Sequence, residues 1–164
     1  MNQRILVAMS GGVDSSVAAA LLVQQGYDVV GVTMKTFCYS GSDAHPKTCC
    51  GLDGITDARR VSDALGIPHY VFDVEEDFTR DVIDDFVSEY ARGRTPNPCV
   101  MCNNWLKFGR LWDFAKQVGA ERIATGHYAR LETVEGETRP ALLRGQDHSK
   151  DQSYVLFGID KDLL

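Results

Sequence analysis

RILVAMSGGVDSSVAAALLVQQG, residues 4–26, is the stretch of sequence that decides the fold. Its first part, Arg4 to Met9, is a mostly apolar run that predicts a buried strand. The strand runs directly into Ser10-Gly11-Gly12, and the Ala- and Leu-rich part from Ser16 to Gln25 predicts a helix that Gly26 stops. The order is therefore strand, tight glycine loop, helix.

The alternation of strand and helix continues along the chain. Further strands are predicted at Val29–Met34, His69–Phe72 and Arg122–Thr125, and further helices at Ile55–Leu65 with Asp53 as its N-cap, at Glu75–Tyr90 and at Phe108–Val118. An antiparallel hairpin follows, from Tyr128 to Arg144 with its turn at Glu135-Gly136. The fold class is α/β: an open, mostly parallel, Rossmann-like sheet with helices on both faces and an added antiparallel hairpin near the C-terminus. The ligand site of such a sheet lies beyond the carboxyl ends of its strands.

Composition limits the function further. The chain has 164 residues, of which 44% are hydrophobic and 24% charged, and a formal net charge of -6, so it does not attract polyanions in bulk and any RNA contact must be local. No apolar run is long enough to cross a bilayer, so no membrane partner is expected. A single cytoplasmic domain over residues 1–164 is predicted. Because another element begins at Asp151–Phe157, shortly before the last residue, this domain is expected to be the N-terminal part of a longer protein.

The segment SGGVDSS, Ser10 to Ser16, is typical of an anion site. Backbone N–H groups and the helix dipole face the same point between a strand and the following helix. Two glycines allow close backbone approach, the serine hydroxyls add donors, and Asp14 can orient Mg²⁺ or fix the loop. No lysine precedes the final serine, which excludes the nucleoside-triphosphate P-loop, and the dinucleotide pattern is absent too. The alternative is a glycine-rich turn before a serine-capped helix.

This segment resembles the pyrophosphate loop of the ATP pyrophosphatase superfamily. The resemblance implies that ATP is split between its α- and β-phosphates, that an acceptor is adenylated, and that the loop holds pyrophosphate. It does not choose the acceptor, because amidating synthetases and tRNA-thiolating enzymes share the loop.

A second segment, RTPNPCVMCN at residues 94–103, places two prolines before a C-x-x-C pair. Read as a stiff loop, it can aim a nucleophilic thiol, and Arg92, Arg94 or Lys107 could supply a positive field that favours the thiolate. Three readings stay open: a catalytic or sulfur-carrying thiol, a metal or iron–sulfur ligand, or inert buried cysteines. A zinc site completed by Cys49-Cys50 is weaker, since adjacent cysteines lack the usual spacer. Cys38 makes the cysteine count five, and an odd count without an export signal favours metal, redox or nucleophilic chemistry over a disulfide framework.

Over essentially all 164 residues the chain resembles the tRNA-specific 2-thiouridylases. The matching strings are Ala8–Ser15, Gly31–Lys35, Cys50–Arg60, Gly93–Asn103, Thr125–Arg130 and Lys150–Tyr154. The resemblance implies the adenine-nucleotide alpha-hydrolase-like fold and 2-thiolation of the wobble uridine of tRNA. In that family ATP with Mg²⁺ adenylates the uridine O2, AMP leaves, and sulfur delivered as a cysteine persulfide takes its place. An upstream donor, either a cysteine desulfurase or a relay protein, supplies the sulfur.

The same resemblance implies roles for individual residues. Cys102 matches the nucleophile, and Lys150, Asp151 and Gln152 match a segment that contacts tRNA. Asn97, Pro98 and Cys99 match the segment that lines the target base. The residues that match the ATP site are Ala8, Met9, Ser10, Gly11, Gly12, Val13, Asp14, Ser15, Met34 and Gly126.

Two departures from the family pattern add expectations. Some relatives carry Asp at the position of Cys99, so the C-x-x-C form raises the alternative that Cys99 and Cys102, with a third cysteine, hold a [4Fe-4S] cluster that carries the sulfur. The family's persulfide cysteine and its tRNA-binding and β-barrel domains lie downstream of the matched region. The chain alone is therefore expected to bind ATP without completing thiolation. A nucleotide- and metal-binding module or a sulfur-relay protein is the alternative, whereas an amidating enzyme has no use for Cys102.

Overall fold

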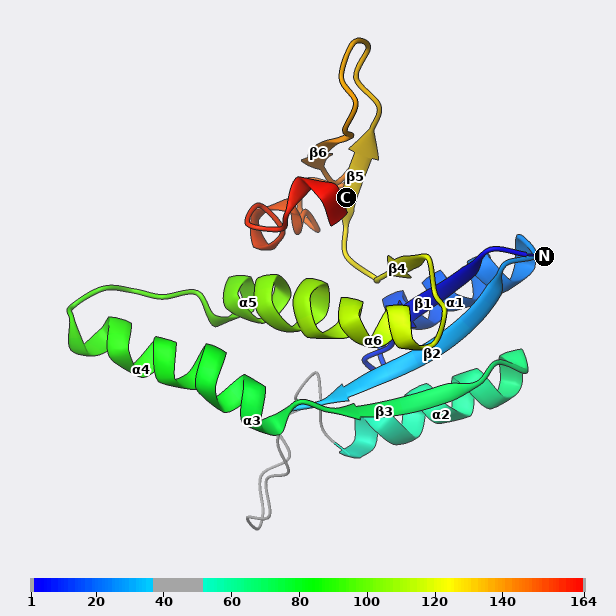
Figure 1. Ribbon diagram of the computed structural model, residues 1–164, viewed down its shortest axis with the longest axis horizontal. Coiled ribbons are helices and arrows are strands. Elements are labelled where there is room, and N and C mark those ends of the chain that lie inside the picture. Colours follow the sequence, from blue (N-terminus) through cyan, green and yellow to red (C-terminus); the bar gives the residue numbers. More distant parts are fainter. Residues whose placement is uncertain (1, 37–51, 164) are drawn as a thin grey trace. The chain divides into compact units, whose positions relative to one another are not determined.

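The computed structural model describes residues 2–36 and 52–163 (Figure 1). The chain folds into two compact units. Unit 1 consists of Met1–Glu76 and Trp112–Gly126, and unit 2 consists of Asp77–Leu111 and His127–Leu164. Unit 1 holds a parallel sheet and the helices packed on it, and unit 2 holds the larger parts of two helical segments and a hairpin.

The sheet of unit 1 has four parallel strands in the order β3-β2-β1-β4. They are β1 (Arg4–Ala8), β2 (Asp28–Lys35), β3 (His69–Asp73) and β4 (Arg122–Ala124). The chain moves outward from β1 to β3 and then crosses to the other side of β1 to form β4. The strand order therefore reverses between β1 and β4, which is where open α/β sheets form a ligand crevice at the carboxyl ends of the strands.

Helices cover both faces of this sheet, as predicted. Side chains alternate across a strand, so Ile5 and Val7 of β1 point to the same face, where they join a core with Ala19 of α1 (Val13–Gln24) and Ala58 of α2 (Leu52–Leu65). On the opposite face, the ring of Phe114 in α6 (Leu111–Gln117) stacks on Phe72 with ring centroids 5.0 Å apart. Two faces packed in this way bury the middle of the two central strands, Ile5–Val7 of β1 and Val29–Met34 of β2.

Two helix starts differ from the prediction. The helix α1 begins at Val13 and not at Ser16, because Gly12 adopts the extended N-cap conformation at φ -82° and ψ 166°. The expectation that Asp53 caps α2 is wrong, since α2 begins at Leu52 and Asp53 lies inside its first turn. An acidic residue there still favours the helix through the dipole.

The first helical segment of unit 2 is continuous, as predicted, but is not uniform. It consists of α3 (Glu75–Phe78), the π-helical turn η1 (Thr79–Ile83) and α4 (Asp84–Ala91). The apolar side chains of this segment are buried to different extents: Val82 is 1% exposed, whereas Tyr90 at the far end is 53% exposed.

The second helical segment begins about ten residues before the predicted helix. It consists of α5 (Pro98–Met101), the π-helical stretch η2 (Cys102–Arg110) and α6. The interpretation of residues 94–103 as a stiff loop is therefore wrong from Pro98 onward. Asn97 caps the helix with its side chain, and Pro98 occupies a first-turn position where its missing N–H costs nothing.

The predicted hairpin is present and forms a sheet of its own. Strands β5 (Ala129–Glu132) and β6 (Ala141–Arg144) pair in antiparallel register. The short 3₁₀ helices η3 (Ser153–Val155) and η4 (Lys161–Leu163) follow, and a small core around Leu156 packs against Ala129 and Leu142 of the hairpin. Among the residues described, no helix combines the length and apolar character needed to cross a membrane.

Candidate functional site

The glycine loop closes on itself at the carboxyl end of β1. Ser15 is 5% exposed, and its Oγ accepts a hydrogen bond from the Ser10 N–H at 3.2 Å and donates to the Gly12 carbonyl at 3.2 Å. The Ser16 Oγ donates to the same carbonyl at 2.8 Å. Gly11 has φ +79°, in the left-handed region that a side chain rarely adopts. The serines thus shape the loop around the start of α1, where the first N–H groups of the helix have no partner within the helix.

The serine-capped helix that stood as the alternative is not what forms. Gly12 is the N-cap, and no side chain caps α1. Val13 is 77% exposed and Asp14 is also exposed in the first turn, which places an acidic side chain beside the mouth of the loop.

Gly126 follows β4 and lies against the first turn of α1. A Cβ atom added at Gly126 would stand 2.7 Å from the Ser15 nitrogen and 2.9 Å from the Asp14 carbonyl carbon. Only glycine permits this approach, so the structure brings together Gly126 and the loop residues that the sequence analysis grouped with it. Ala8 and Met9 lead into the loop, and Met9 N–H donates to the Val32 carbonyl at 2.8 Å.

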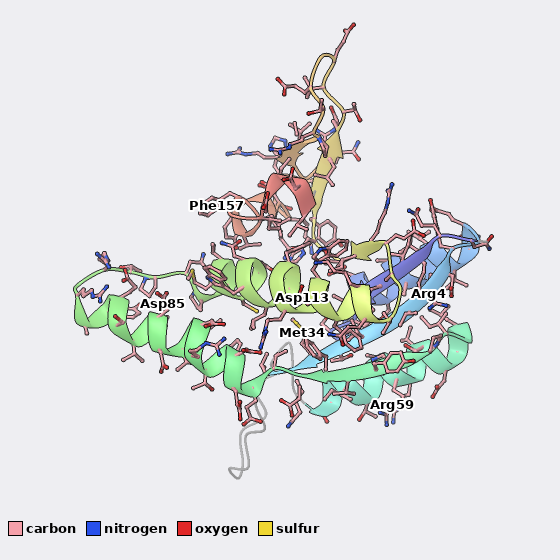
Figure 2. All side chains as sticks on the ribbon, viewed as in Figure 1. Arg4, Met34, Arg59, Asp85, Asp113 and Phe157 are labelled. Carbon is pink, nitrogen blue, oxygen red and sulfur yellow. The ribbon has the colours of Figure 1, made fainter. Side chains whose placement is uncertain are left out.

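Met34 lies near the carboxyl end of the neighbouring strand β2 (Figure 2). It is 5% exposed, and it pairs in register with Phe72 of β3. The candidate ATP-binding residues therefore all belong to unit 1 and gather where the strands β1, β2 and β4 end.

One glycine beside this loop, Gly54, was not predicted from the sequence to belong to the site. Gly54 lies in the first turn of α2, and a Cβ atom added there would stand 2.7 Å from the Ser10 carbonyl oxygen. A Cβ atom at Gly11 would in turn stand 2.7 Å from the Gly54 Cα. A glycine in the first turns of an otherwise good helix was the available signal, because glycine weakens a helix and usually has a packing reason there.

The two cysteines of the C-x-x-C pair lie in the first turns of the second helical segment. Cys99 is exposed and Cys102 is partly buried. At a spacing of three residues on a helix, the two side chains share a face. Asn97 holds this helix start, because its Oδ1 accepts hydrogen bonds from the Cys99 N–H at 3.0 Å and from the Val100 N–H at 3.4 Å.

The turn after Cys102 is anchored in the interior of unit 2. Asn103 is 1% exposed, and its Nδ2 donates to the Val155 carbonyl at 3.2 Å. The π-helical stretch starts at Cys102 itself, and such stretches inside α-helices are frequent at functional sites. The position of Cys102 is therefore tied to the segment that follows the hairpin.

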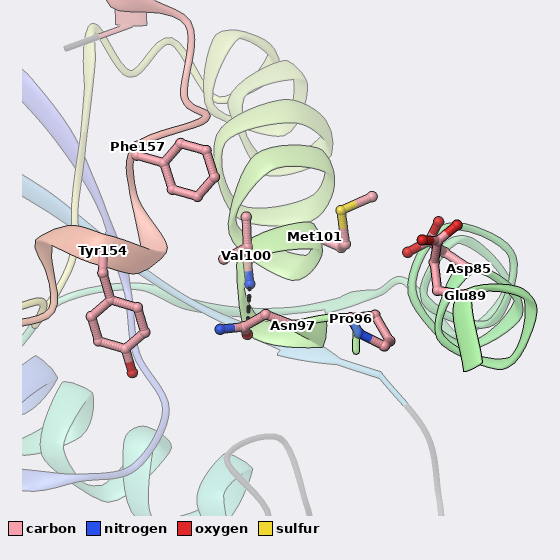
Figure 3. Close-up of a pocket in the computed structure, with 8 residues that line it drawn as sticks. All are labelled: Asp85, Glu89, Pro96, Asn97, Val100, Met101, Tyr154 and Phe157. Carbon is pink, nitrogen blue, oxygen red and sulfur yellow. Dashed lines mark hydrogen bonds between the residues drawn. The ribbon is translucent and has the colours of Figure 1, made fainter. Parts of the chain in front are cut away.

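A shallow groove of about 470 Å³ runs beside this helix start (Figure 3). Tyr154 and Phe157 stand on one side of the helix and the carboxylates of Asp85 and Glu89 on the other, with Asn97 between them. The residues that line it are Asp85, Glu89, Pro96, Asn97, Val100, Met101, Tyr154 and Phe157. The groove thus includes the first of the three residues expected to line the target base.

The arginines expected to supply a positive field beside the cysteines are paired elsewhere. Arg94 forms a two-pronged ion pair with Glu89, and Arg92 lies 3.4 Å from the same carboxylate. The Arg94 guanidinium holds the pKa of Glu89 below its ordinary value. Lys107 lowers the pKa of His127, although burial is the larger cause, and the two effects bring it to about 4. His127 is therefore neutral at pH 7.

The segment expected to contact tRNA divides into one exposed cation and two internal braces. Asp151 Oδ1 accepts hydrogen bonds from the Gly145 N–H at 2.8 Å and the Ser153 N–H at 3.1 Å. Gln152 Oε1 accepts from the Tyr128 N–H at 3.0 Å, and Gln152 N–H donates to the Tyr128 carbonyl at 2.8 Å. Lys150 is exposed.

The metal readings of the cysteines receive limited support. Across residues 2–36 and 52–163, no group of three His, Cys, Asp or Glu side chains is placed to hold a metal ion. Cys38 and the Cys49-Cys50 pair of the zinc hypothesis lie outside the described residues. Cys99 and Cys102 thus supply two thiols where a [4Fe-4S] cluster takes three or four, and the described residues alone do not fit a cluster.

Comparison with known proteins identifies the family. The sequence-family model of the tRNA methyl transferase HUP domain matches residues 3–164 of the chain. The chain belongs to this HUP domain family. The chain is also 55% identical to a tRNA-specific 2-thiouridylase MnmA of Geobacter metallireducens, over 99% of the chain and 45% of that relative. It is 52% identical to the protein of that name from Geotalea uraniireducens, over 99% of the chain and 44% of the relative. For Desulforamulus reducens the identity is 53%, over 100% of the chain and 45% of the relative.

The HUP-domain chain spans about half the length of these curated relatives. The family match agrees with the α/β architecture, in which a parallel sheet is covered by helices on both faces.

Proposed function

We propose that this chain is the ATP-binding, cysteine-bearing part of a tRNA-specific 2-thiouridylase. The observation that carries the proposal is the serine-braced glycine loop at the start of α1, with Asp14 beside it and Gly126 pressed against it. Relatives about half identical over nearly the whole chain are named tRNA-specific 2-thiouridylases, which supports the choice of a tRNA uridine as acceptor.

ATP with Mg²⁺ is a substrate in this proposal, and unit 1 binds it. The loop from Ala8 to Ser15 holds the β- and γ-phosphates through backbone N–H groups at the start of α1, and Asp14 orients the Mg²⁺. Met34 and Gly126 contact the rest of the nucleotide. The uridine O2 then attacks the α-phosphorus, the β–γ unit leaves as pyrophosphate, and the loop keeps that product bound.

Unit 2 presents the base and the thiol. Asn97, Pro98 and Cys99 line the target base, and Cys102 is the nucleophilic thiol beside it. Sulfur arrives from a cysteine desulfurase or a relay protein as a persulfide, whose terminal sulfur attacks C2 of the uridine while AMP leaves with the O2 oxygen. The Cys102 thiolate then attacks the other sulfur of the C2–S–S–cysteine link. That attack breaks the S–S bond, leaves the 2-thio group on the base and forms a disulfide between Cys102 and the carrier cysteine, which an external thiol reduces for the next turnover. The proposed route carries the sulfur as a persulfide, and Cys99 and Cys102 are the cysteines that the described part of unit 2 places at this helix start.

Lys150 makes the phosphate contact to tRNA in this proposal. Its exposure fits a contact to the RNA backbone, which needs a positive charge and no sequence information. Asp151 and Gln152 hold the segment that carries Lys150 to the hairpin through their bonds to Gly145 and Tyr128. We further propose that residues 1–164 act as one catalytic domain and that tRNA-binding and β-barrel domains follow downstream in the whole protein.

Substitution of the two cysteines tests this function. In the whole protein, Cys102→Ser abolishes formation of 2-thiouridine in tRNA, measured by mass spectrometry of the digested RNA, while binding of Mg-ATP is retained. Cys99→Ser removes the other thiol of the same helix, and it is expected to keep measurable 2-thiouridine formation, because Cys99 lines the base without being the nucleophile. Sulfur transfer that survives Cys102→Ser would refute the role of Cys102. A wild-type protein that produces no AMP from ATP in the presence of tRNA would favour the alternative of a binding module or sulfur-relay protein.

A further inference from the structure

The phosphate loop is in backbone contact with the first turn of α2, a contact that the sequence of the loop does not predict. Gly54, in the first turn of α2, lies against the backbone of the loop, and a side chain at either Gly54 or Gly11 would collide with backbone atoms of the other segment. A Cβ atom at Gly54 would stand 2.7 Å from the Ser10 carbonyl oxygen, a separation that real Cβ atoms essentially never show. Backbone is on both sides of this contact, so no flexible side chain can give way.

The contact falls at the most constrained point of the loop. Gly11 is in the left-handed conformation, with φ +79°, and Ser10 donates its N–H to the Ser15 Oγ. A shift of the Ser10 carbonyl therefore turns the Ser10–Gly11 peptide, which sets the conformation of Gly11, and does so in the residue whose N–H bonds to the Ser15 Oγ. Gly126 presses on the same loop from β4, at Asp14 and Ser15. The loop is thus held between two glycines, Gly54 on the α2 side and Gly126 on the β4 side.

We infer that Gly54 is a positioning residue for the anion-binding loop. Its lack of a side chain lets the first turn of α2 set the path of Ser10 and Gly11, and so aims the N–H groups that bind the pyrophosphate part of ATP. This inference rests on the proposed function for the identity of the anion. Alanine forms helices better than glycine, so helix propensity alone predicts that Gly54→Ala stabilises α2. The contact with the loop predicts that the same substitution weakens ligand binding.

Binding of Mg-ATP and of inorganic pyrophosphate to the full chain, measured by titration calorimetry, tests the inference. Gly54→Ala lowers both affinities by about tenfold or more, the loss that follows when a charge-assisted hydrogen bond to phosphate is withdrawn. Gly109→Ala is the matched control, because it makes the same change in a helical segment where the added Cβ atom would stand 3.4 Å from the Asn104 carbonyl oxygen. Its affinities equal those of the wild type. Equal binding by Gly54→Ala and wild type overturns the inference, whereas a wild-type chain that binds neither ligand refutes the proposed function itself.

Hydrogen exchange gives a second test that needs no variant. In the wild type, pyrophosphate slows exchange of the amides of residues 55–58 in α2 together with those of the loop, because the two backbones are in contact. The amides of residues 62–65, at the far end of the same helix, are the internal control and do not change. Protection confined to the loop and α1 would show that α2 does not sense the bound anion, and would overturn the inference even if Gly54→Ala failed to fold.

Discussion

Asn97 has two separable jobs in this structure, and substitution can separate them. Its Oδ1 caps the helix that carries Cys99 and Cys102, through one good hydrogen bond of 3.0 Å and one long one of 3.4 Å. Its Nδ2 points away from the helix in Figure 3, toward the side of Tyr154. We predict that Asn97→Ala destabilises the chain by about 1 kcal/mol, the usual loss for removing an N-cap. For a chain of this length, that corresponds to a fall in Tm of about 2–4 °C.

Aspartate and serine are equally good caps, so Asn97→Asp and Asn97→Ser keep the stability of the wild type within a few tenths of a kcal/mol. Asn97→Asp replaces the Nδ2 donor by an acceptor. We therefore expect it to lose 2-thiouridine formation while its urea unfolding curve stays at the wild-type midpoint. An Asn97→Ala variant as stable as the wild type would refute the cap. An Asn97→Asp variant with full activity would refute a base contact through Nδ2 and leave the cap as the role of Asn97.

Two further predictions concern the stability of unit 2. Leu106 is 0% exposed, so Leu106→Ala lowers the free energy of unfolding in urea by about 2–5 kcal/mol, whereas Lys150→Ala, at an exposed position, changes it by less than about 0.5 kcal/mol. The pKa of His127 lies at about 4 in the folded chain, below its ordinary value of 6.5, so the unfolded chain binds the extra proton first as the pH falls. The stability that goes with neutral His127 is present above pH 6.5 and is lost toward pH 4; His127→Gln flattens this part of the pH profile of urea unfolding, and an unchanged profile would contradict the assignment.

The sheet could be predicted because its strands carry their own signal. Val29 to Met34 is apolar and rich in β-branched residues on both faces, as a strand covered by helices on both sides must be. The helix that carries the cysteines could not be predicted in the same way. Pro96 and Pro98 favour a loop when they are read locally, yet Pro98 occupies the first turn of a helix and Asn97 is its cap. The same residues serve both structures, and packing of Leu106 and Asn103 into unit 2 decides between them.

Contacts between distant segments account for the rest of what sequence reasoning missed. Asp151 and Gln152 look like surface residues in the sequence, but their partners are backbone groups of Gly145 and Tyr128, which only the fold brings near. The role of Gly54 could not be predicted for the same reason, since the group that it contacts is the backbone of Ser10, far away in the sequence. Backbone-to-backbone approach leaves no pattern of polarity or periodicity, and a glycine inside a helix is its one trace.

The helical setting of Cys99 and Cys102 changes the chemistry that the pair can support. A loop could move two thiols independently toward a metal or a persulfide, but a capped helix fixes their separation and places both on one face. Arg92 and Arg94 are held by Glu89, so the described part of unit 2 does not direct these two guanidinium groups at the cysteines as the sequence suggested. The backbone N–H at Cys102 is already bonded to carbonyls of the preceding turn, so Cys102 lies beyond the unpaired N–H groups of the helix start. The cap at Asn97 therefore holds the helix start in which Cys102 is partly buried. Asn97→Ala, by loosening that helix start, should speed alkylation of Cys102 by iodoacetamide, whereas Asn97→Ser, an equally good and neutral cap, should keep the wild-type rate.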